Sequence, residues 1–354
     1  MVTGSSRHPI LRGGILAMLA ALAFGVTTPL IQRYGRGVGP LPSASLLYAG
    51  AALASISIAG KREGREAHIR SRHVGRLVLV AFMGGLVAPV LLTWGLQRTT
   101  ATNGSLLLNF EAIFTVVFAW LFFRERIGPR VAMAMTLMVA GGVWLVMSGV
   151  ARVGGLGLGA IAVVLATMAW ALDNTLTRPL ADLDPTEVVR WKGTLGAGAA
   201  ATLSVILHQP FPRLDATLAL LACGATGYGV SLRLYLLAQR RIGAARTGSI
   251  FALAPFVGAG AAWLLGDRSG DATTLLAGAL FGLGVYLHLS ETHGHRHQHA
   301  PSEHEHLHRH DDGHHDHVHD PAVPGAHSHL HRHDARTHEH PHAPDLHHQH
   351  EHES

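Results

Sequence analysis

The sequence has little cysteine, little charge and few aromatic residues. Its 354 residues include one cysteine, Cys223, while charged and aromatic residues make up only 14% and 6% of the chain. A single cysteine excludes a disulfide within the chain and argues against a thiol metal site. The sequence also lacks a nucleophile–base pair, a phosphate-binding loop and a catalytic metal motif, so we do not expect an enzyme.

Aromatic residues are missing altogether from the end of the chain. Residues 293–354 contain no Phe, Trp or Tyr but hold 23 of the 28 histidines. They have 4 basic and 11 acidic residues, whereas residues 1–292 have 24 basic and 12 acidic residues. A segment this polar cannot bury enough apolar surface to offset the entropy lost on ordering. We therefore predict a folded body followed by a disordered tail over 291–354.

The body consists of long apolar runs. A membrane-spanning helix needs about 20 mainly apolar residues. Ten such runs occur, at 13–32, 41–60, 74–96, 101–123, 131–150, 156–179, 187–207, 215–238, 245–266 and 272–290. Several are rich in Gly and Ala, which lets helices pack closely in lipid. The sequence therefore predicts an all-α integral membrane protein with ten transmembrane helices in the lipid bilayer.

The basic residues predict the orientation of the helices. They form short clusters between the apolar runs, a pattern of membrane-flanking loops rather than of a nucleic-acid surface, so we expect no nucleic-acid partner. With residues 1–12 in the cytoplasm, the inner segments hold 17 Lys and Arg and the outer loops hold 6. Because positive charge concentrates on the cytoplasmic side, we expect both termini there.

An internal repeat divides the body into halves at 13–150 and 151–290. Residues 94–114 resemble residues 236–256. Two residue pairs recur within this match, Gln-Arg at 97–98 and 239–240 and Gly-Ser at 104–105 and 248–249. Each half then has five helices, and an odd number of crossings gives the halves opposite orientations. Inverted repeats of this kind are common among secondary transporters.

The fourth predicted helix of each half closes on an acidic residue, Glu125 or Asp267. Two five-helix halves of this kind resemble the drug/metabolite transporter superfamily, specifically its EamA-type members. In that family this helix often carries a proline in its middle. Pro255 keeps the pattern in the second half, whereas Glu111 stands in its place in the first. The resemblance covers about residues 13–290 and implies a transporter for amino acids, other metabolites or toxic compounds.

Glu111 is the first candidate for a transport residue. It lies near the middle of the run 101–123. A carboxylate at that depth is costly unless it faces a partner or a wet cavity, so it is a functional candidate by default. Glu111 would bind a cation, or take and release a proton that drives export. The alternative is a protonated or hydrogen-bonded structural residue.

Two polar pairs at corresponding positions of the repeat are further candidates. Asp173 and Asn174 lie in the run 156–179, and their repeat partners are Thr27 and Thr28, next to Pro29. A proline beside polar residues can break a helix locally, as at transporter binding sites. The alternative for Asp173 is a place near the lipid headgroups.

Arg233, Asn109 and Pro255 complete the candidate substrate residues. Arg233 would pair with Glu111 or Asp173, attract an anionic substrate group, or extend to the cytoplasmic surface. Asn109 precedes Glu111 by two residues, and Pro255 occupies the matching place in the second half.

The tail predicts a metal-binding segment. Histidines alternate at i and i+2, which places imidazoles on one side of an extended chain. Imidazole suits Zn²⁺, Ni²⁺, Co²⁺ and Cu²⁺, and neighbouring carboxylates add oxygen ligands. The candidate ligands are His293, His295, His297, His299, His304, His306, His308, His310, His314, His315, His317, His319, His327, His329, His331 and His333. No cofactor is required by the body itself.

Three functions remain open from the sequence. The first is an exporter of small metabolites or toxic compounds in the bacterial inner membrane, with a regulatory or buffering tail. The second is an exporter of divalent metal ions, with the tail as the collector. The third is a metal sensor or storage protein that does not transport. The apolar runs argue mildly against metal export, because they offer only Glu111 and Asp173 as deep carboxylates.

Overall fold

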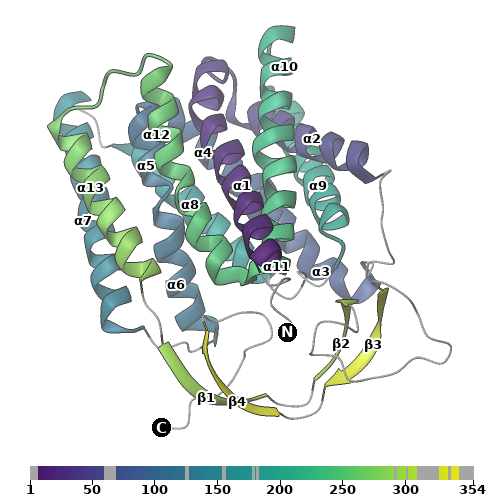
Figure 1. Ribbon diagram of the computed structural model, residues 1–354. Helices are drawn as coiled ribbons and strands as arrows, with labels where there is room; N and C mark the ends of the chain where they lie inside the picture. The colour runs from purple at the N-terminus through teal and green to yellow at the C-terminus, as the bar shows by residue number, and fades with distance from the viewer. Residues whose placement is uncertain are drawn as a thin grey trace.

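The computed structural model describes residues 7–59, 69–123, 127–153, 157–177, 180, 183–290, 293–299, 302–308, 327–333 and 336–342. The body is helical (Figure 1). Its elements are α1 (Arg7–Tyr34), α2 (Pro40–Ala59), α3 (Ser71–Val80), η1 (Ala81–Val87), α4 (Ala88–Leu96), α5 (Ala101–Leu107), α6 (Phe110–Phe123), α7 (Pro129–Val153), α8 (Leu158–Thr177), α9 (Pro185–Ile206), α10 (Leu214–Cys223), η3 (Gly224–Val230), α11 (Ser231–Phe251), α12 (Ala254–Leu264) and α13 (Ala272–Leu289).

Seven helical stretches in the described part of the chain are long and apolar enough to cross a membrane. They are Leu11–Tyr34, Ser71–Leu96, Ala101–Phe122, Pro129–Ser148, Leu158–Thr177, Leu214–Gln239 and Arg246–Leu264. Each coincides with one predicted run. The other three runs form α2, α9 and the shorter apolar helix α13, and a total of ten crossings stays a prediction. The cytoplasmic segment 1–12 stays a prediction; helix α1 begins at Arg7, and its stretch of membrane length begins at Leu11.

Side-chain caps mark where several helices begin. Thr100, Asp184 and Asp271 each precede a helix, and their side-chain oxygens accept hydrogen bonds from backbone N–H groups at the helix start. Such caps satisfy N–H groups that have no partner within the helix. The local sequence therefore fixes the starts of α5, α9 and α13.

The fourth predicted helix of each half is interrupted. The first half has a break between Leu107 and Phe110, and the second has one between Phe251 and Ala254, 144 residues further along. The runs 101–123 and 245–266 are therefore not single regular helices. The Gly-Ser pairs of the repeat have the same spacing, so the two breaks occupy equivalent positions.

The third predicted helix of each half contains a π-helical turn. The π-helix η1 begins at Ala81 and η3 begins at Gly224, 143 residues later. Both segments are glycine-rich, with the sequences AFMGGLV and GATGYGV. Short π segments within α-helices often accompany functional sites. The halves thus share two irregularities at matching places, while their inverted orientation stays a prediction.

Helix α11 reverses direction within its length. A straight helix would separate the Cα atoms of Tyr235 and Phe251 by about 24 Å. Their rings instead lie 5.0 Å apart, and the hydroxyl of Tyr235 is 4.0 Å from an ideal Cβ at Gly248. The chain must therefore fold back between these residues, which agrees with the predicted boundary between the runs 215–238 and 245–266.

The helices of the two halves pack against each other in an exchanged pattern. Helix α1 packs on α11 and α12, and its repeat counterpart α8 packs on α4 and α6. Helix α2 pairs with α9, and α7 pairs with α13 (Figure 1). A two-fold relation between the halves would produce this exchange of partners.

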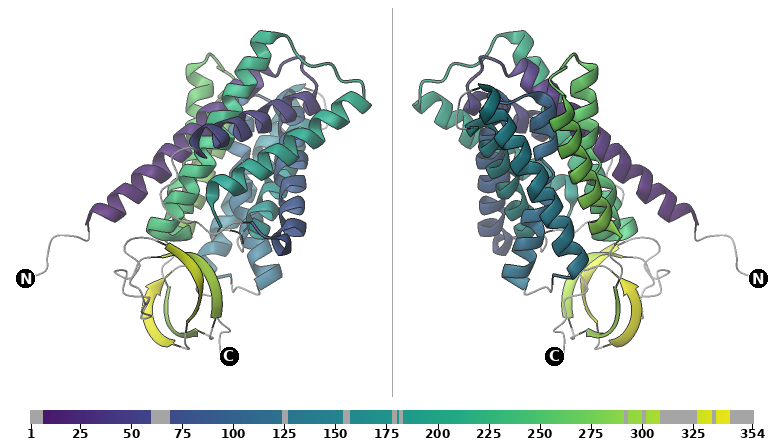
Figure 2. Two further views of the ribbon diagram at one scale, coloured as in Figure 1. Left: turned by 90° about the vertical axis from the view of Figure 1, so that its right-hand side faces the viewer. Right: turned by 90° about the vertical axis from the view of Figure 1, so that its left-hand side faces the viewer.

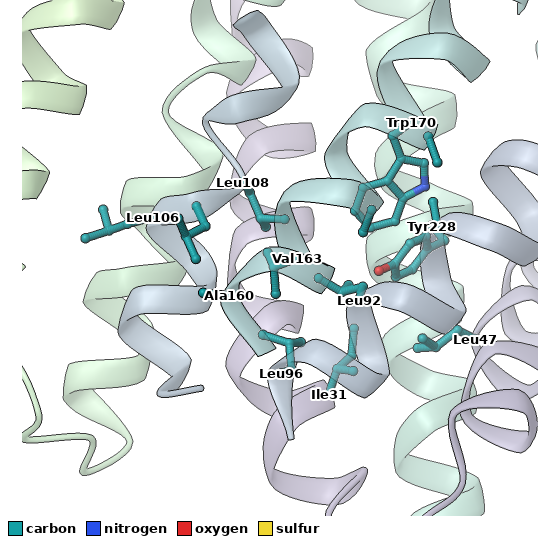
Figure 3. Close-up of a cluster of buried hydrophobic side chains, with 14 of the residues drawn as sticks. Ile31, Leu47, Leu92, Leu96, Leu106, Leu108, Ala160, Val163, Trp170 and Tyr228 are labelled. Atoms are coloured by element: carbon teal, nitrogen blue, oxygen red, sulfur yellow. The ribbon is translucent and has the colours of Figure 1, made fainter. Parts of the chain in front are cut away.

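The main hydrophobic core lies between the halves. It includes Leu47, Leu92, Val163 and Tyr228, which come from α2, α4, α8 and η3 (Figure 3). Leucine, valine and aromatic side chains from both halves fill this interface, so the core joins the two halves rather than lying inside each.

The start of α1 and the end of α13 lie at the same end of the bundle (Figures 1 and 2). The C-terminal strands are found at this end. Strand β1 (His293–His299) pairs antiparallel with β4 (Arg336–His342), and β2 (Ser302–His308) pairs with β3 (His327–His333). These residues differ from the expected disordered tail. The physical reason is their alternation of residues, whose period of two is that of a β-strand.

Candidate functional site

Glu111 lies at the start of α6, directly after the break in the first half. Asn109 lies in the break, and its Nδ2 donates a 2.8 Å hydrogen bond to the carbonyl oxygen of Leu106. The same carbonyl accepts a 3.1 Å hydrogen bond from the Asn109 backbone N–H, so both groups of Asn109 bind the last turn of α5. The break therefore positions the Glu111 carboxylate at a helix start, a favourable place for negative charge.

The predicted break near Pro29 is not present. Helix α1 continues through Thr27, Thr28 and Pro29, and the Thr27 hydroxyl donates a 2.6 Å hydrogen bond to the carbonyl oxygen of Phe24. Proline removes one hydrogen bond of the helix but leaves the helix able to continue when packing supports it. Here α1 packs on α11 and α12.

Glu111 makes a polar contact between the two halves. The Nδ2 of Asn174 in α8 donates a 2.7 Å hydrogen bond to Oε1 of Glu111. Glu111 is half-buried. Two candidate residues that lie far apart in the sequence are thus brought together.

Asp173 has a partner that sequence reasoning missed. The Lys192 ammonium in α9 forms an ion pair with the Asp173 carboxylate, and both side chains are buried. The Thr177 hydroxyl lies 3.4 Å from the same carboxylate. Lys192 was not among the candidates singled out from the sequence. Its position within the apolar run 187–207 was the available signal, because a buried charge in a membrane needs a partner.

A glycine in each half makes room for the polar side chain of the other half. The Asp173 carboxylate lies directly against Gly84 in η1, where any Cβ would overlap it. Thr27, the repeat partner of Asp173, lies in the same way against Gly227 in η3. The π-helical turns therefore adjoin the predicted polar positions in both halves, although only one half carries a charge there.

Aromatic side chains form a continuous cluster beside these polar residues. Phe24 contacts Trp170, Tyr228 and Phe251, with ring centroids 5.6–6.1 Å apart. Tyr228 also contacts Tyr48 at 5.4 Å, and Tyr235 contacts Phe251 at 5.0 Å. The Trp170 Nε1 and the Tyr48 hydroxyl both donate to the carbonyl oxygen of Gly84. The cluster thus joins α1, α2, α8, η3 and α11.

Asn174 is an exposed polar residue near the end of α8. It is exposed, yet it lies within about 20° of Val163 and Thr167 on the α8 surface. Both of those residues are fully buried between helices. Asn174 lies three residues before the end of α8, closer to the end of the helix than these two buried residues. Its amide binds Glu111 there.

Arg233 does not pair with either predicted carboxylate. Its Nε lies 3.3 Å from the hydroxyl of Thr186, near the start of α9. Pro255 is buried in the first turn of α12, after the break of the second half. Proline is well tolerated at that position because its missing N–H would have no helical partner.

Comparison with known proteins identifies the family. The model of the EamA-like transporter family matches the chain over residues 11–147 and again over 157–290. The chain belongs to the EamA-like transporter family. It is therefore a multi-pass membrane protein of the drug/metabolite type, and members of this family are transporters rather than enzymes.

Two further similarities agree with this EamA-like assignment. A protein of Methanothermobacter thermautotrophicus named an uncharacterized transporter is 28% identical over 233 residues. That match covers 63% of this chain and 66% of the relative, just under two thirds of its length. A solved structure titled only as a crystal structure of protein shares 18% identity with a TM-score of 0.56. It covers 78% of this chain and 96% of that one, and indicates the fold alone.

The acidic residue of the second EamA-like half joins the two halves at a helix end. Asp267 accepts hydrogen bonds from the backbone N–H and the hydroxyl of Thr102, at 2.9 and 3.0 Å, at the start of α5. Burial raises the pKa of Asp267, but hydrogen bonds from Ser269 and Thr102 outweigh it, and the pKa lies below its ordinary value. Gly266 precedes it with a φ of 101°, a backbone conformation that favours glycine. Glu125 lies outside the described residues.

The predicted metal ligands of the tail are only partly described. His310, His314, His315, His317 and His319 lie outside the described residues. The others lie on β1, β2 and β3, and histidines occupy directly opposite positions in both pairs of strands. The opposed pairs are His293 and His342, His295 and His340, His297 and His338, His304 and His331, His306 and His329, and His308 and His327. In the described helices, no three His, Cys, Asp or Glu side chains come together to hold a metal.

Proposed function

We propose that the protein is a secondary transporter that exports small metabolites or toxic compounds from the cytoplasm. The observation that carries this proposal is the Glu111–Asn174 hydrogen bond, which joins a half-buried carboxylate of one half to an exposed amide of the other. We place the protein in the bacterial inner membrane with both termini in the cytoplasm, as the distribution of basic residues predicts.

Alternating access would work by rocking one half against the other. In inverted-repeat transporters, substrate and coupling-ion sites lie between the halves near broken helices. Glu111 meets both conditions, since it follows a helix break and contacts the opposite half. Taking up a proton would remove the negative charge of Glu111 and weaken its hydrogen bond with the Asn174 amide. Glu111 would thereby couple proton binding to the contact between the halves.

Asp173 has a structural part in this mechanism. Its charge is already balanced by Lys192, and both side chains are buried. Breaking a buried pair leaves an uncompensated charge, which is strongly unfavourable. The pair would therefore persist through the cycle and hold α8 against α9. This leaves Glu111 as the carboxylate that exchanges its proton.

Inside-out membrane vesicles test this proposal. A respiratory substrate acidifies their interior, and an acridine dye reports the pH gradient. A panel of amino acids, amines and quaternary ammonium compounds is added one at a time. We expect at least one compound to release protons through the wild-type protein but not through Glu111→Gln. Asp215→Asn is the matched control, because Asp215 is exposed at the start of α10. Equal proton release by wild type and Glu111→Gln would contradict the coupling role.

We further propose that the tail binds divalent metal, which keeps metal export as the second candidate function. The six opposed histidine pairs support metal binding, since imidazole suits Zn²⁺, Ni²⁺, Co²⁺ and Cu²⁺. The helix bundle argues against metal export. Among the described residues, Glu111 is the one deep carboxylate that forms no ion pair with a cation. A dehydrated divalent ion normally takes several such ligands.

Total cellular metal separates these possibilities. Cells loaded with Ni, Co, Zn or Cu are compared by mass spectrometry for the full chain, a truncation after Thr292 and Glu111→Gln. A drop in one metal that Glu111→Gln abolishes would establish metal export. Unchanged metal, or a rise that needs the tail, would indicate buffering or sensing, and the cargo would then be a metabolite.

A further inference from the structure

We propose that the C-terminal strands form two sites for a divalent ion, one on each strand pair, and that the two sites fill cooperatively. The outer pair is β1 with β4, and the inner pair is β2 with β3. This proposal rests on the proposed metal binding by the tail and names the arrangement and regulation of its sites. Three observations carry it: the faces of the strand pairs, the charges between the histidines, and the nesting of the pairs.

All histidines of a strand pair lie on one of its two faces. Directly opposed residues share a face, and so does every second residue along a strand. The outer pair has three opposed histidine pairs and, on the same face, His299 opposite Arg336. The inner pair also has three, and His333 opposite Ser302 lies on that face. Each of these faces therefore carries seven histidines, and the opposite faces of the four described strands carry none.

Opposite charges across the strands favour this register. Arg296 lies opposite Glu339 in the outer pair, and Glu303 lies opposite Arg332 in the inner pair. Opposite charges at directly opposed positions stabilise an antiparallel pair. A slip of either strand pair by one residue would place a histidine opposite each of these charges. The charged face therefore favours the alignment that brings the histidines of the other face together.

Two neighbouring histidine pairs have the spacing of a four-ligand site. Opposed residues have Cβ atoms about 4.5–5.5 Å apart, and alternate residues of a strand lie about 6.6 Å apart. Zn²⁺ is typically held by four ligands in a tetrahedron, with Zn–N distances of about 2.0–2.1 Å. Four imidazoles from two neighbouring pairs can therefore surround one ion. Because its ligands come from both strands, binding the ion also closes the strand pair.

The two strand pairs are nested, which couples the sites. The 36 residues 300–335 separate β1 from β4, whereas the 18 residues 309–326 separate β2 from β3. Once the inner pair has closed, only the two-residue connections 300–301 and 334–335 separate it from the outer pair. The entropy cost of closing a chain rises with its length, so shortening the closed length to about 4 residues raises the outer affinity by about 20- to 30-fold. Such a coupling is reciprocal, so each site strengthens the other.

Cooperative filling would make the tail a switch. Independent sites fill gradually as the concentration of free ion rises, whereas coupled sites fill over a narrower range. The outer pair begins at His293, shortly after α13 ends at Leu289 (Figure 1). Its closure would therefore take place next to the helix bundle. This behaviour favours sensing of the ion over simple storage.

Zinc titration of the full chain tests this inference. Purified protein in detergent is dialysed against buffers of known free Zn²⁺, and zinc per chain is measured by mass spectrometry. We expect two tightly bound ions with a Hill coefficient clearly above about 1. Removing histidines from either strand pair should leave one tightly bound ion, no cooperativity, and half-saturation at about threefold to tenfold more Zn²⁺, because the coupling is lost. The inner variant is His304→Asn, His306→Asn and His308→Asn, and the outer variant is His338→Asn, His340→Asn and His342→Asn.

Two further variants separate the arrangement of the histidines from their number. His315→Asn, His317→Asn and His319→Asn remove three histidines outside the described strands and should leave both ions and their cooperativity. The second variant keeps the composition of β3 but changes HSHLHRH at 327–333 to HHHHSLR, which leaves two histidines on each face in any register. It should behave like the inner variant. Binding without cooperativity by the wild type, or wild-type binding by the rearranged variant, would overturn the proposal.

Truncation after Thr292 separates this proposal from the metal binding on which it rests. If the truncation loses zinc binding while the inner and outer variants bind as the wild type does, the coupled sites are overturned and a metal-binding tail is retained. Zinc binding that survives the truncation would overturn both. Thermal unfolding of each variant checks that the helix bundle is intact, and the vesicle assay decides the transport function independently.

Discussion

The Lys192 ammonium and the Asp173 carboxylate form an ion pair inside the helix bundle, between α9 and α8. We predict that Lys192→Met destabilises the protein by about 3–5 kcal/mol, because it leaves a buried carboxylate without its partner. Thermal unfolding of the purified chain in detergent measures this effect.

The double variant Asp173→Asn with Lys192→Met provides the control. It removes both charges, and replacing a buried pair by neutral groups is often close to neutral in stability. The double variant should therefore be more stable than Lys192→Met alone. If the two unfold at the same temperature, the pair does not contribute through its charge.

Gly84 is predicted to tolerate no side chain. A Cβ there would overlap the Asp173 carboxylate, so Gly84→Ala must displace the ion pair or the π-helical turn. Overpacking of this kind costs about 1–3 kcal/mol. Thermal unfolding should show a clear loss for Gly84→Ala. Gly198→Ala is the control, since Gly198 is exposed on α9 with nothing within 4 Å of an added Cβ. An equal effect of the two substitutions would contradict the assigned contact.

Asp267 should stabilise the start of α5 in a pH-dependent way. Its pKa is lowered in the folded protein, so the stabilisation is present above the unfolded pKa of about 4 and is lost as the pH falls through the lower folded value. Asp267→Asn should reduce stability by about 1 kcal/mol at pH 7, as for loss of a helix cap. Unfolding measured at decreasing pH should show the difference between wild type and variant shrinking below about pH 4. A difference independent of pH would exclude the carboxylate as its cause.

Zinc binding by the tail should weaken as the pH falls. Imidazoles titrate near pH 6.5 and bind metal only when neutral. Calorimetric titration of the full chain in detergent should therefore give a lower Zn²⁺ affinity at pH 5 than at pH 7.5. A truncation after Thr292 should lose this binding. Equal affinity at both pH values, or binding that survives the truncation, would exclude the tail histidines as the ligands.

Sequence reasoning recovered the helices because apolar runs of membrane length have few alternative structures. It also found Glu111 and Asp173, since carboxylates are rare at membrane depth. Sequence reasoning predicted a local break in the first helix at Pro29, but α1 is continuous there. The structure instead has a break beside Asn109, between α5 and α6. A proline removes one backbone hydrogen bond of a helix. Whether the helix then breaks depends on how it packs against neighbouring helices. The π-helical turns could not be foreseen, because their glycines also fit a regular membrane helix.

The sequence by itself determined that this chain is a helical membrane protein of duplicated, EamA-like character with a histidine-rich end. Hydrophobicity, repeat spacing and composition are properties of the chain itself, so they can be read from the sequence alone. Only the tertiary structure decided which polar groups meet. Lys192 and Asp173 lie 19 residues apart, and Asn174 and Glu111 lie 63 apart. Their pairing depends on how α6, α8 and α9 pack, which is a property of all the helices together and not of any single run.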